Sequence, residues 1–265
     1  MRFTAHEHAQ YARDGFVLRE KIFDAAELAD LHRTIERVVA DIVAHAQRPD
    51  AGPTFTFGAG HRLQFSSRTV IQWEWREGSR AVRLMEPFTH LDPAFMALWD
   101  DPRFVEPMKD ALGVEAVGPF TCKLNLKRPR EGSEFPWHQD YPYWYVRTPE
   151  HAHEVVTGML FLDDATVDNG ALRVLPGSHL RGPAPRDRHE VTGFLADPLR
   201  IDVDREVMIE AAAGSLLIFP ALLLHHSTPN TSARQRRAML LSFQPAGRVR
   251  HEELPWHPER VDELP

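Results

Sequence analysis

The chain has 265 residues, a formal net charge of −7 from 31 basic and 38 acidic side chains, and one cysteine, Cys122. The negative charge argues against non-specific binding to nucleic acid, and a single cysteine excludes an intrachain disulfide. No stretch has the length and apolar character of a membrane span, and the first residues lack the apolar segment of a signal peptide. We therefore expect a cytoplasmic protein that binds neither nucleic acid nor membrane.

The N-terminal region predicts two helices. Thr4, followed three residues later by Glu7, forms a capping box, and Gly15 is the expected end of this first helix. A strand over residues 16–18 follows. The second helix should begin at Asp24, because the apolar residues after it recur at helical spacing. These apolar residues are Leu28, Leu31, Ile35, Val38, Val39 and Ile42.

The next segment combines a loop with two short helices. Residues 48–60 are rich in Pro and Gly and predict a loop. Asp92-Pro93 and Asp101-Pro102 are typical of a capping residue followed by the first helical turn. The first of these helices should end near Trp99 and the second at Gly113.

From about residue 115 the pattern changes to short apolar runs that alternate with turn residues. This pattern predicts a mainly β protein with flanking helices, whose core is an antiparallel sandwich or jelly roll. We expect one domain over residues 1–265, with a helical and strand extension (1–114), a jelly-roll core (115–247) and a tail (248–265). The expected strands cover residues 120–126, 155–162, 171–175, 216–219, 221–224 and 239–243.

A His-x-Asp motif, His138 and Asp140, lies near the middle of this region. Residues at i and i+2 of a strand share a face, so both side chains should point into the mouth of the sandwich if the strand continues through them. A surface turn is the alternative, but the surrounding rings favour a pocket wall. These rings belong to Trp137, Tyr141, Tyr143, Trp144 and Tyr145.

The third ligand should come from the distant pair His225-His226, of which only one can face the metal because adjacent strand residues point in opposite directions. Two imidazoles and one carboxylate leave three positions of an octahedral ion open, which is typical of Fe(II) oxygenases, whereas zinc prefers four tetrahedral ligands. One of Arg236 and Arg237 is then expected to bind the distal carboxylate of 2-oxoglutarate, together with Ser227.

Taken together, these motifs resemble the phytanoyl-CoA dioxygenase family of Fe(II)- and 2-oxoglutarate-dependent oxygenases. The resemblance covers residues 9–245 and includes segments 11–17 and 168–179. It implies a double-stranded β-helix (cupin-like) core, an iron ion, 2-oxoglutarate and O2. The family pattern places the carboxylate-binding Arg eleven residues after the distal His. It therefore implies His225 as ligand and Arg236 (236 − 225 = 11) as anchor, with His226 at a position that is usually Gly. Related halogenases have a small residue at the position of Asp140, so halogenation is disfavoured.

Within the family, the chain is similar to ectoine hydroxylase and to hydroxylases of free amino acids. This similarity implies that Asn125 contacts 2-oxoglutarate and that Lys123 and Trp144 line the substrate pocket. We expect Trp137 and Tyr141 to contribute to the same pocket. The alternative for Trp144 is that its ring only packs the loop.

The predicted activity is hydroxylation of an unactivated C–H bond of a small molecule, with release of succinate and CO2. One alternative is a cupin-type isomerase or hydrolase with another divalent metal, and the other is a non-catalytic β-sandwich that binds a ligand. The sequence does not reveal which amino acid, small acid or natural-product intermediate is the substrate. The choice between hydroxylation, desaturation and ring formation, and the oligomeric state, are equally open.

Overall fold

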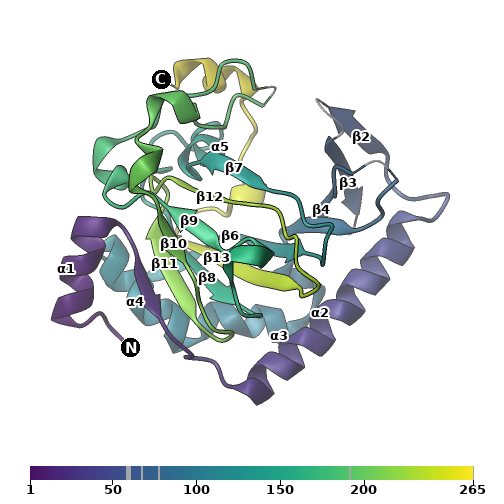
Figure 1. The fold of residues 1–265 in the computed structure, drawn as a ribbon, viewed down its shortest axis with the longest axis horizontal. Helices are drawn as coiled ribbons and strands as arrows, with labels where there is room; N and C mark the ends of the chain where they lie inside the picture. Colours follow the sequence, from purple (N-terminus) through teal and green to yellow (C-terminus); the bar gives the residue numbers. More distant parts are fainter. Residues whose placement is uncertain (58–60, 67, 77, 191, 265) are drawn as a thin grey trace.

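Two antiparallel β-sheets face each other in the computed structural model, which describes residues 1–57, 61–66, 68–76, 78–190 and 192–264 (Figure 1). Within these ranges the larger sheet has nine strands. In spatial order they are β1 (Val17–Arg19), β11 (Leu216–Pro220), β8 (Val156–Phe161), β13 (Arg236–Pro245), β6 (Val117–Lys127), β5 (Val82–Glu86), β4 (Thr69–Trp73), β3 (His61–Ser66) and β2 (Thr54–Phe57). The smaller sheet consists of β10 (Val207–Ile209), β9 (Leu172–Val174), β12 (His225–Ser227) and β7 (Phe135–His138).

The predicted mainly β fold with flanking helices is confirmed. Every strand pair in the described ranges is antiparallel, and strands distant in sequence pair with each other, such as β6 with β13 and β11 with β8. The two facing antiparallel sheets agree with the expected jelly-roll core. The division into one domain with boundaries at residues 114 and 247 stays a prediction.

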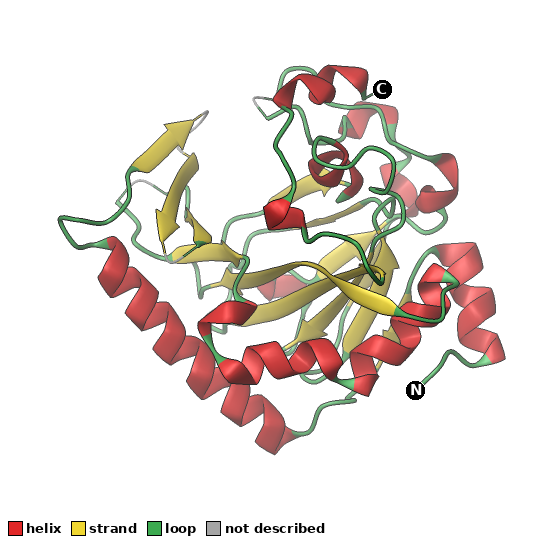
Figure 2. Cartoon of the chain, turned by 180° about the vertical axis from the view of Figure 1, so that it is seen from behind, coloured by secondary structure: helices red, strands yellow, loops and turns green. Residues whose placement is uncertain are grey.

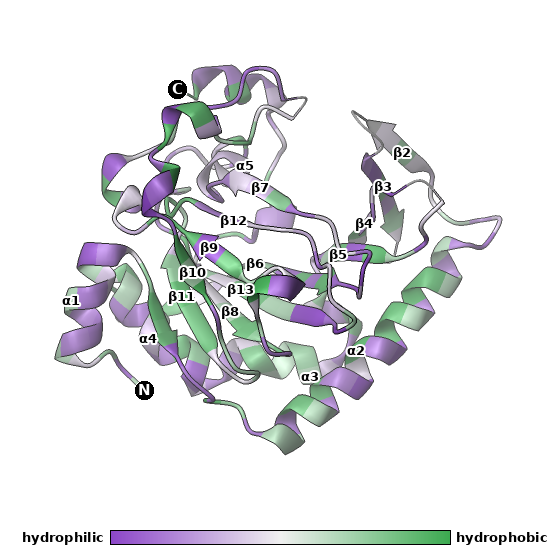
Figure 3. Ribbon diagram, in the orientation of Figure 1, coloured by the Kyte–Doolittle hydropathy of each residue, from purple (hydrophilic) through white to green (hydrophobic). Residues whose placement is uncertain are grey.

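The N-terminal helices begin and end where their capping residues predict. In α1 (Ala5–Asp14) the Thr4 side chain accepts a bond from the Glu7 amide, and Gly15 closes the helix with φ of 84°. The second helix, α2 (Ala25–Ala46), begins after Asp24, which caps it in the same manner. Its six predicted apolar positions are all buried. Figure 3 shows the resulting alternation of hydrophobic and hydrophilic residues along α2.

Two further helical segments also follow the prediction. The segment after Asp92 forms α3 (Pro93–Met96) and continues as a 3-10 turn over Ala97–Asp100. The segment after Asp101 forms α4 (Pro102–Leu112), which ends at Gly113 and accommodates a proline in its interior. Both helices therefore start with proline in the first turn, where the missing N–H costs no hydrogen bond.

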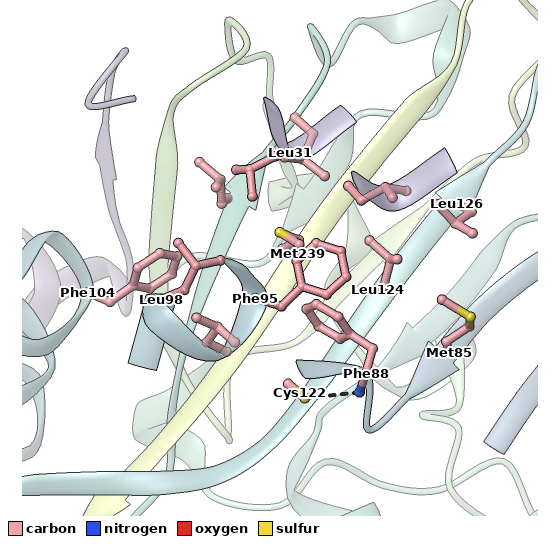
Figure 4. Close-up of a cluster of buried hydrophobic side chains, with 14 of the residues drawn as sticks. Leu31, Met85, Phe88, Phe95, Leu98, Phe104, Cys122, Leu124, Leu126 and Met239 are labelled. Carbon is pink, nitrogen blue, oxygen red and sulfur yellow. Dashed lines mark hydrogen bonds between the residues drawn. The ribbon is translucent and has the colours of Figure 1, made fainter. Parts of the chain in front are cut away.

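These helices cover one face of the larger sheet, as Figure 2 shows from behind. Figure 4 shows part of the apolar core between them, where Phe95 of the helical layer lies beside Leu124 and Met239 of the sheet. The Cys122 thiol belongs to this core, is 2% exposed, and accepts a hydrogen bond from the Phe88 amide at 3.3 Å. Burial raises the pKa of this thiol to about 11.

The other face of the same strands points between the two sheets. On β6, Cys122, Leu124 and Leu126 belong to the helix-covered core. Their neighbours Lys123 and Asn125 line a cavity instead. Strand β13 repeats this division, since Arg236 and Leu240 line the cavity whereas Met239 and Leu241 belong to the core. The alternation of side chains along a strand thus separates the polar residues of the site from the apolar core.

Three local predictions were wrong. The predicted loop 48–60 contains β2, because the alternation of threonine with aromatic residues over 54–57 pairs well with β3; residues 58–60 lie outside the described ranges. Residues 221–224 form a turn that leads into β12 rather than a strand. The strand that carries His138 ends there, and the short helix α5 (Tyr141–Tyr145) follows.

None of the described helices is long and apolar enough to cross a bilayer.

Candidate metal centre

Three predicted ligands, His138, Asp140 and His225, come together between the sheets. His138 is the last residue of β7 and is paired directly with His225, the first residue of β12. One potential ligand atom from each of the three side chains lies within 4.8 Å of the other two. The centroids of the two imidazole rings are 4.2 Å apart. A single cation can therefore be shared by these three side chains.

The position of Asp140 depends on the turn after His138 rather than on strand alternation. Asp140 has helical backbone angles (φ −71°, ψ −24°) and starts α5, so the expectation of a continuous strand was wrong. The Gln139 side chain fixes this turn. Its amide nitrogen donates to the carbonyls of Gly182 and Leu222, at 3.1 and 2.7 Å, and its oxygen accepts from the Ala184 amide at 2.8 Å. The carboxylate is thereby directed to the same side as His138.

Hydrogen bonds to the backbone orient both imidazoles. Nδ1 of His138 donates to the Pro136 carbonyl at 2.7 Å, and Nδ1 of His225 donates to the Leu223 carbonyl at 2.9 Å. A carbonyl only accepts, so each Nδ1 carries the proton and each Nε2 offers a lone pair to a metal. Burial, and next the neighbouring His225, lower the pKa of His138 to about 3, and burial also lowers that of His225. Both rings are thus neutral, as metal ligation requires.

Asp140 belongs to a buried group of charges with Lys123 and Glu86. Lys123 Nζ lies 3.4 Å from Asp140 Oδ1. Burial acts against ionisation of Asp140, but the charge of Lys123 outweighs it, and the pKa of Asp140 is lowered. Burial likewise opposes the charge on Lys123, yet the Glu86 and Asp140 carboxylates raise its pKa. Burial raises the pKa of Glu86, which accepts a hydrogen bond from Thr121 at 2.9 Å.

His226 points away from this centre, as the alternation along a strand requires. Its Nε2 lies 2.8 Å from a Glu206 carboxylate oxygen, and its ring lies 4.1 Å from that of Trp137. Glu206 also accepts a bond from Arg173. His226, which stands where the family usually has glycine, is therefore part of an ion-pair group on the other face of the small sheet.

The two neighbouring arginines, Arg236 and Arg237, have opposite surroundings. Arg237 forms a two-bond ion pair with Asp163, at 2.8 and 2.7 Å, and a further bond to Glu36 at 2.9 Å. Arg236 is 1% exposed and lines the cavity, where it donates only to the Gly170 carbonyl at 2.7 Å. Its Nε has no partner within the described ranges. Burial lowers the pKa of Arg236 to about 10, so it remains a buried cation without a carboxylate partner among the described residues.

The other predicted contacts of 2-oxoglutarate, Asn125 and Ser227, line the same cavity. Asn125 Oδ1 is buried without a hydrogen-bond partner in the described part of the chain, and Ser227 is 1% exposed. Buried polar atoms of this kind normally have partners, so such an atom indicates a position where a ligand binds. The cavity measures about 170 Å³, below the ~300–1,000 Å³ typical of pockets for drug-sized ligands.

Of the four predicted substrate contacts, the structure brings only Lys123 to the cavity. Trp144 packs against Phe120 with its ring 5.4 Å away, which agrees with the alternative that it only packs the loop. Tyr141 joins the same cluster, and Trp137 packs against His226 and an apolar cluster beside the small sheet. None of these three rings is among the residues that line the cavity.

Sequence reasoning missed Glu86, Arg83 and Tyr143, which do line the cavity. Tyr143 follows the metal motif in α5 and was included only in the general group of aromatic residues. Arg83 and Glu86 belong to β5, in the region expected to be an extension of the core. The available signal was two charged residues within the apolar run 81–88, since charges in a buried strand indicate a binding site.

The residues present fit an Fe(II) ion and 2-oxoglutarate. Two neutral imidazoles and one ionised carboxylate form the ligand set of non-haem Fe(II) oxygenases. The cavity beside them contains a buried guanidinium, Arg236, without a carboxylate partner among the described residues. A dicarboxylate with a keto group supplies acceptors for this guanidinium and a ligand for the metal.

A comparison with known families supports this assignment. The model of the family described as "Phytanoyl-CoA dioxygenase (PhyH)" matches residues 11–238. L-proline trans-4-hydroxylase of Streptomyces griseoviridis is 30% identical over 202 residues, which cover 69% of this chain and 73% of that protein. Ectoine dioxygenase of Bordetella parapertussis is 27% identical over 254 residues, covering 91% of this chain and 75% of that protein.

Solved structures show the same fold. The crystal structure of EctD from S. alaskensis with 2-oxoglutarate and 5-hydroxyectoine has a TM-score of 0.69 at 23% identity, covering 92% of this chain and 76% of that chain. The epimerase SnoN, in complex with Fe3+, alpha ketoglutarate and nogalamycin RO, has a TM-score of 0.68 at 19% identity, with 98% and 89% covered. The chain belongs to the phytanoyl-CoA dioxygenase family and is a 2-oxoglutarate-dependent dioxygenase that uses iron.

Proposed function

We propose that this enzyme hydroxylates a C–H bond of a small molecule, with His138, Asp140 and His225 as iron ligands. In the overall reaction 2-oxoglutarate, O2 and the substrate C–H give succinate, CO2 and the corresponding alcohol. The observation that carries the proposal is the juxtaposition of the three ligand atoms, within 4.8 Å of one another, with the buried Arg236 in the same cavity.

Each protein group has a separate role in this proposal. When bound, the iron ion supplies activation of dioxygen coupled to oxidative decarboxylation of the co-substrate. Arg236 and Ser227 hold the distal carboxylate of 2-oxoglutarate, and Asn125 orients the molecule. Lys123, beside Asp140 at 3.4 Å, keeps that carboxylate ionised and lies at the wall where a substrate enters. The apolar side chains around the cavity exclude water, which limits side reactions.

The relatives named above favour a substrate of amino-acid size, because their names give proline and ectoine as the molecules they act on. Hydroxylation is the simplest outcome, and ring formation or desaturation would require the same set of protein groups. We place the enzyme in the cytoplasm, with a small molecule as its partner. An isomerase, a hydrolase or a binding module would leave the buried charge of Arg236 without a function.

The test compares His225→Ala and Asp140→Ala with His226→Ala as a matched control. His226 is an imidazole one residue away that faces Glu206, so its removal leaves the metal ligands intact. We expect both ligand variants to lose succinate formation from 2-oxoglutarate by at least ~100-fold, because each removes one of three metal ligands. His226→Ala should keep most of this activity. Succinate release with Fe(II), ascorbate and a set of amino acids is the measurement.

Metal content provides a second readout. Wild type and His226→Ala should bind one Fe(II) per chain under anaerobic conditions, whereas His225→Ala and Asp140→Ala should bind it weakly. Full turnover in both ligand variants, or equal loss in His226→Ala, would contradict the assignment of the three ligands.

A further inference from the structure

Arg83 is a second buried guanidinium in the cavity, and the proposed function leaves it without a role. It is 3% exposed and lines the cavity together with the metal ligands. It comes from β5, on the far side of β6 from Arg236. A charge of this kind is costly to bury unless it has a partner of opposite sign.

A β-bulge directs this side chain into the cavity. Between β4 and β5 the register shifts, so that Val82 pairs with Trp73 and Leu84 with Gln72, and Arg83 has no opposite residue. Val82 and Met85 therefore face the helix-covered core, while Arg83, Leu84 and Glu86 all face the cavity. Bulges beside active sites commonly redirect a side chain in this way.

The guanidinium is held rigidly but keeps unused donors. It lies over the rings of Trp75 and Phe135, with 4.1 and 3.8 Å between its central carbon and the ring centres. One Nη atom donates to the Ser133 hydroxyl and the other to the Glu134 carbonyl at 2.6 Å. Nε has no partner within the described ranges. Of the five N–H groups of an arginine, enough remain to bind a carboxylate through two parallel bonds.

No carboxylate of the described residues forms an ion pair with Arg83. Burial lowers the pKa of Arg83 to about 10, and the charges of Glu74 and Glu134 only partly oppose this effect. Glu74 uses one oxygen to accept bonds from the amide and hydroxyl of Ser133, at 3.1 and 2.6 Å. Glu190, at the cavity wall, accepts from Thr192 and from the Gly193 amide.

Among the described residues that line the cavity, three are cations, and two of these form no ion pair with a carboxylate. Lys123 lies beside Asp140 and is stabilised by the Glu86 charge, whereas Arg236 has no such partner and Arg83 reaches the Glu74 carboxylate only through the Ser133 hydroxyl. 2-Oxoglutarate brings one carboxylate for Arg236 and a second that, in the proposed function, binds the metal. One cation therefore remains for the molecule that is hydroxylated.

We propose that Arg83 is a specificity-determining residue that binds a carboxylate of the primary substrate. This inference rests on the proposed function, because it assigns the other free cation to 2-oxoglutarate. The substrate class is then a small carboxylic acid, such as a free amino acid.

The test measures binding by calorimetry to protein loaded with Mn(II) and 2-oxoglutarate, so that no turnover is required. The probes are twenty L-amino acids, L-proline among them, each paired with its carboxamide. Arg83→Met removes the positive charge but keeps a long side chain between the two aromatic rings. Arg83→Lys restores a positive charge at the same place. Arg62→Met is the matched control, because Arg62 lies on β3 of the same sheet, with β4 between it and β5, binds two backbone carbonyls and does not line the cavity.

We expect wild type and Arg62→Met to bind at least one carboxylate probe about 10- to 100-fold more tightly than its carboxamide, the range for a bond to a charged group. Arg83→Met should lose this preference, and Arg83→Lys should recover part of it. The affinity for 2-oxoglutarate should stay unchanged in both variants. Thermal unfolding of each variant verifies that it folds.

Three results would overturn the inference: no probe that distinguishes wild type from Arg83→Met, a preference that survives in Arg83→Met, or a loss of 2-oxoglutarate affinity instead. The last result would mean that Arg83 and Arg236 share the co-substrate. Failure of the proposed function is recognised separately, because wild type would then release no succinate while its Arg83-dependent binding of carboxylates persists.

Discussion

At the scale of single residues, two adjacent side chains of the same type differ in role because they have different hydrogen-bond and ion-pair partners. Arg236 and Arg237 are adjacent on β13, yet Arg236 faces the cavity and has no carboxylate partner among the described residues, whereas Arg237 is bound by Asp163 and Glu36. The same holds for His225 and His226 on β12, of which only the first reaches the metal position. In both pairs a shift by one residue would exchange a functional group for a structural one.

The arginine pair therefore yields a direct comparison. Arg236→Gln should raise the concentration of 2-oxoglutarate needed for half-maximal succinate formation by about 10- to 100-fold, because a charge-assisted bond to its carboxylate is lost. Arg237→Gln should leave that concentration nearly unchanged but lower the free energy of unfolding, because Asp163 is left without its partner. Kinetics at varied 2-oxoglutarate and urea unfolding of both variants are the measurements. The opposite assignment of effects would show that the register of the anchor is wrong.

The residues of the site were predictable where a motif or strand alternation defines them. His138, Asp140, His225, Arg236 and Ser227 follow from spacing together with the family pattern. The charge of Arg83 within an apolar run was a signal, but the faces of this strand could not be predicted, because strict alternation places residues 82, 84 and 86 on one face, whereas the bulge moves Val82 to the other. The positions of Trp144 and Tyr141 depend on the helix α5, which the sequence pattern did not reveal, whereas Trp137 lies on β7 beside His138.

At the scale of elements, side-chain bonds at the junctions between helices and strands hold these elements in place. The junction of α1 with β1 is an example: Arg19 binds the Glu7 carboxylate at 2.7 Å, as well as the carbonyls of Met1 and Arg2. Glu7 also completes the cap of α1. One carboxylate therefore links the start of the first helix to the edge strand of the large sheet.

This carboxylate should make stability depend on pH. The hydrogen bond with Arg19 outweighs burial and lowers the pKa of Glu7 from 4.5 to about 2. A lowered pKa in the folded protein adds stability above pH 4.5, which is lost as the pH falls towards 2. Glu7→Gln should therefore reduce the free energy of unfolding more at pH 6 than at pH 3. Urea unfolding at both values measures it, with the exposed Glu20→Gln as control. An equal reduction at the two pH values would contradict the argument.

Elements with strong local signals were predicted well. Capping residues defined α1, α2 and α4 within a residue, and apolar runs located β6, β8, β9, β11 and β13. Segments 54–57 and 221–224 were misassigned, because pairing with another strand decides whether such short runs extend or turn. Local pattern alone does not contain that information.

At the scale of the whole molecule, the site joins both sheets. The metal ligands lie on and beside β7 and β12 of the small sheet, whereas Arg236 and Asn125 lie on β13 and β6 of the large one. Metal and 2-oxoglutarate bound together would therefore bridge the two layers.

Ligand binding should consequently stabilise the fold against heat. Mn(II) with 2-oxoglutarate at about 100 times its Kd should add about 2.7 kcal/mol, or roughly 5–10 °C in Tm for a chain of this size. Arg236→Gln should keep the increment due to Mn(II) but lose the one due to 2-oxoglutarate at the same concentration. Differential scanning calorimetry of both proteins is the measurement. An undiminished response to 2-oxoglutarate in Arg236→Gln would contradict its role as anchor.

The buried position of Cys122 has a practical consequence. The thiol is enclosed between the helical layer and the large sheet, and its pKa of about 11 leaves very little thiolate at neutral pH. Because the chain contains no other cysteine, alkylating reagents can label it only when this layer separates from the sheet. The rate at which Cys122 is alkylated thus reports how often the apolar core opens. It can be measured by mass spectrometry without any added reporter group.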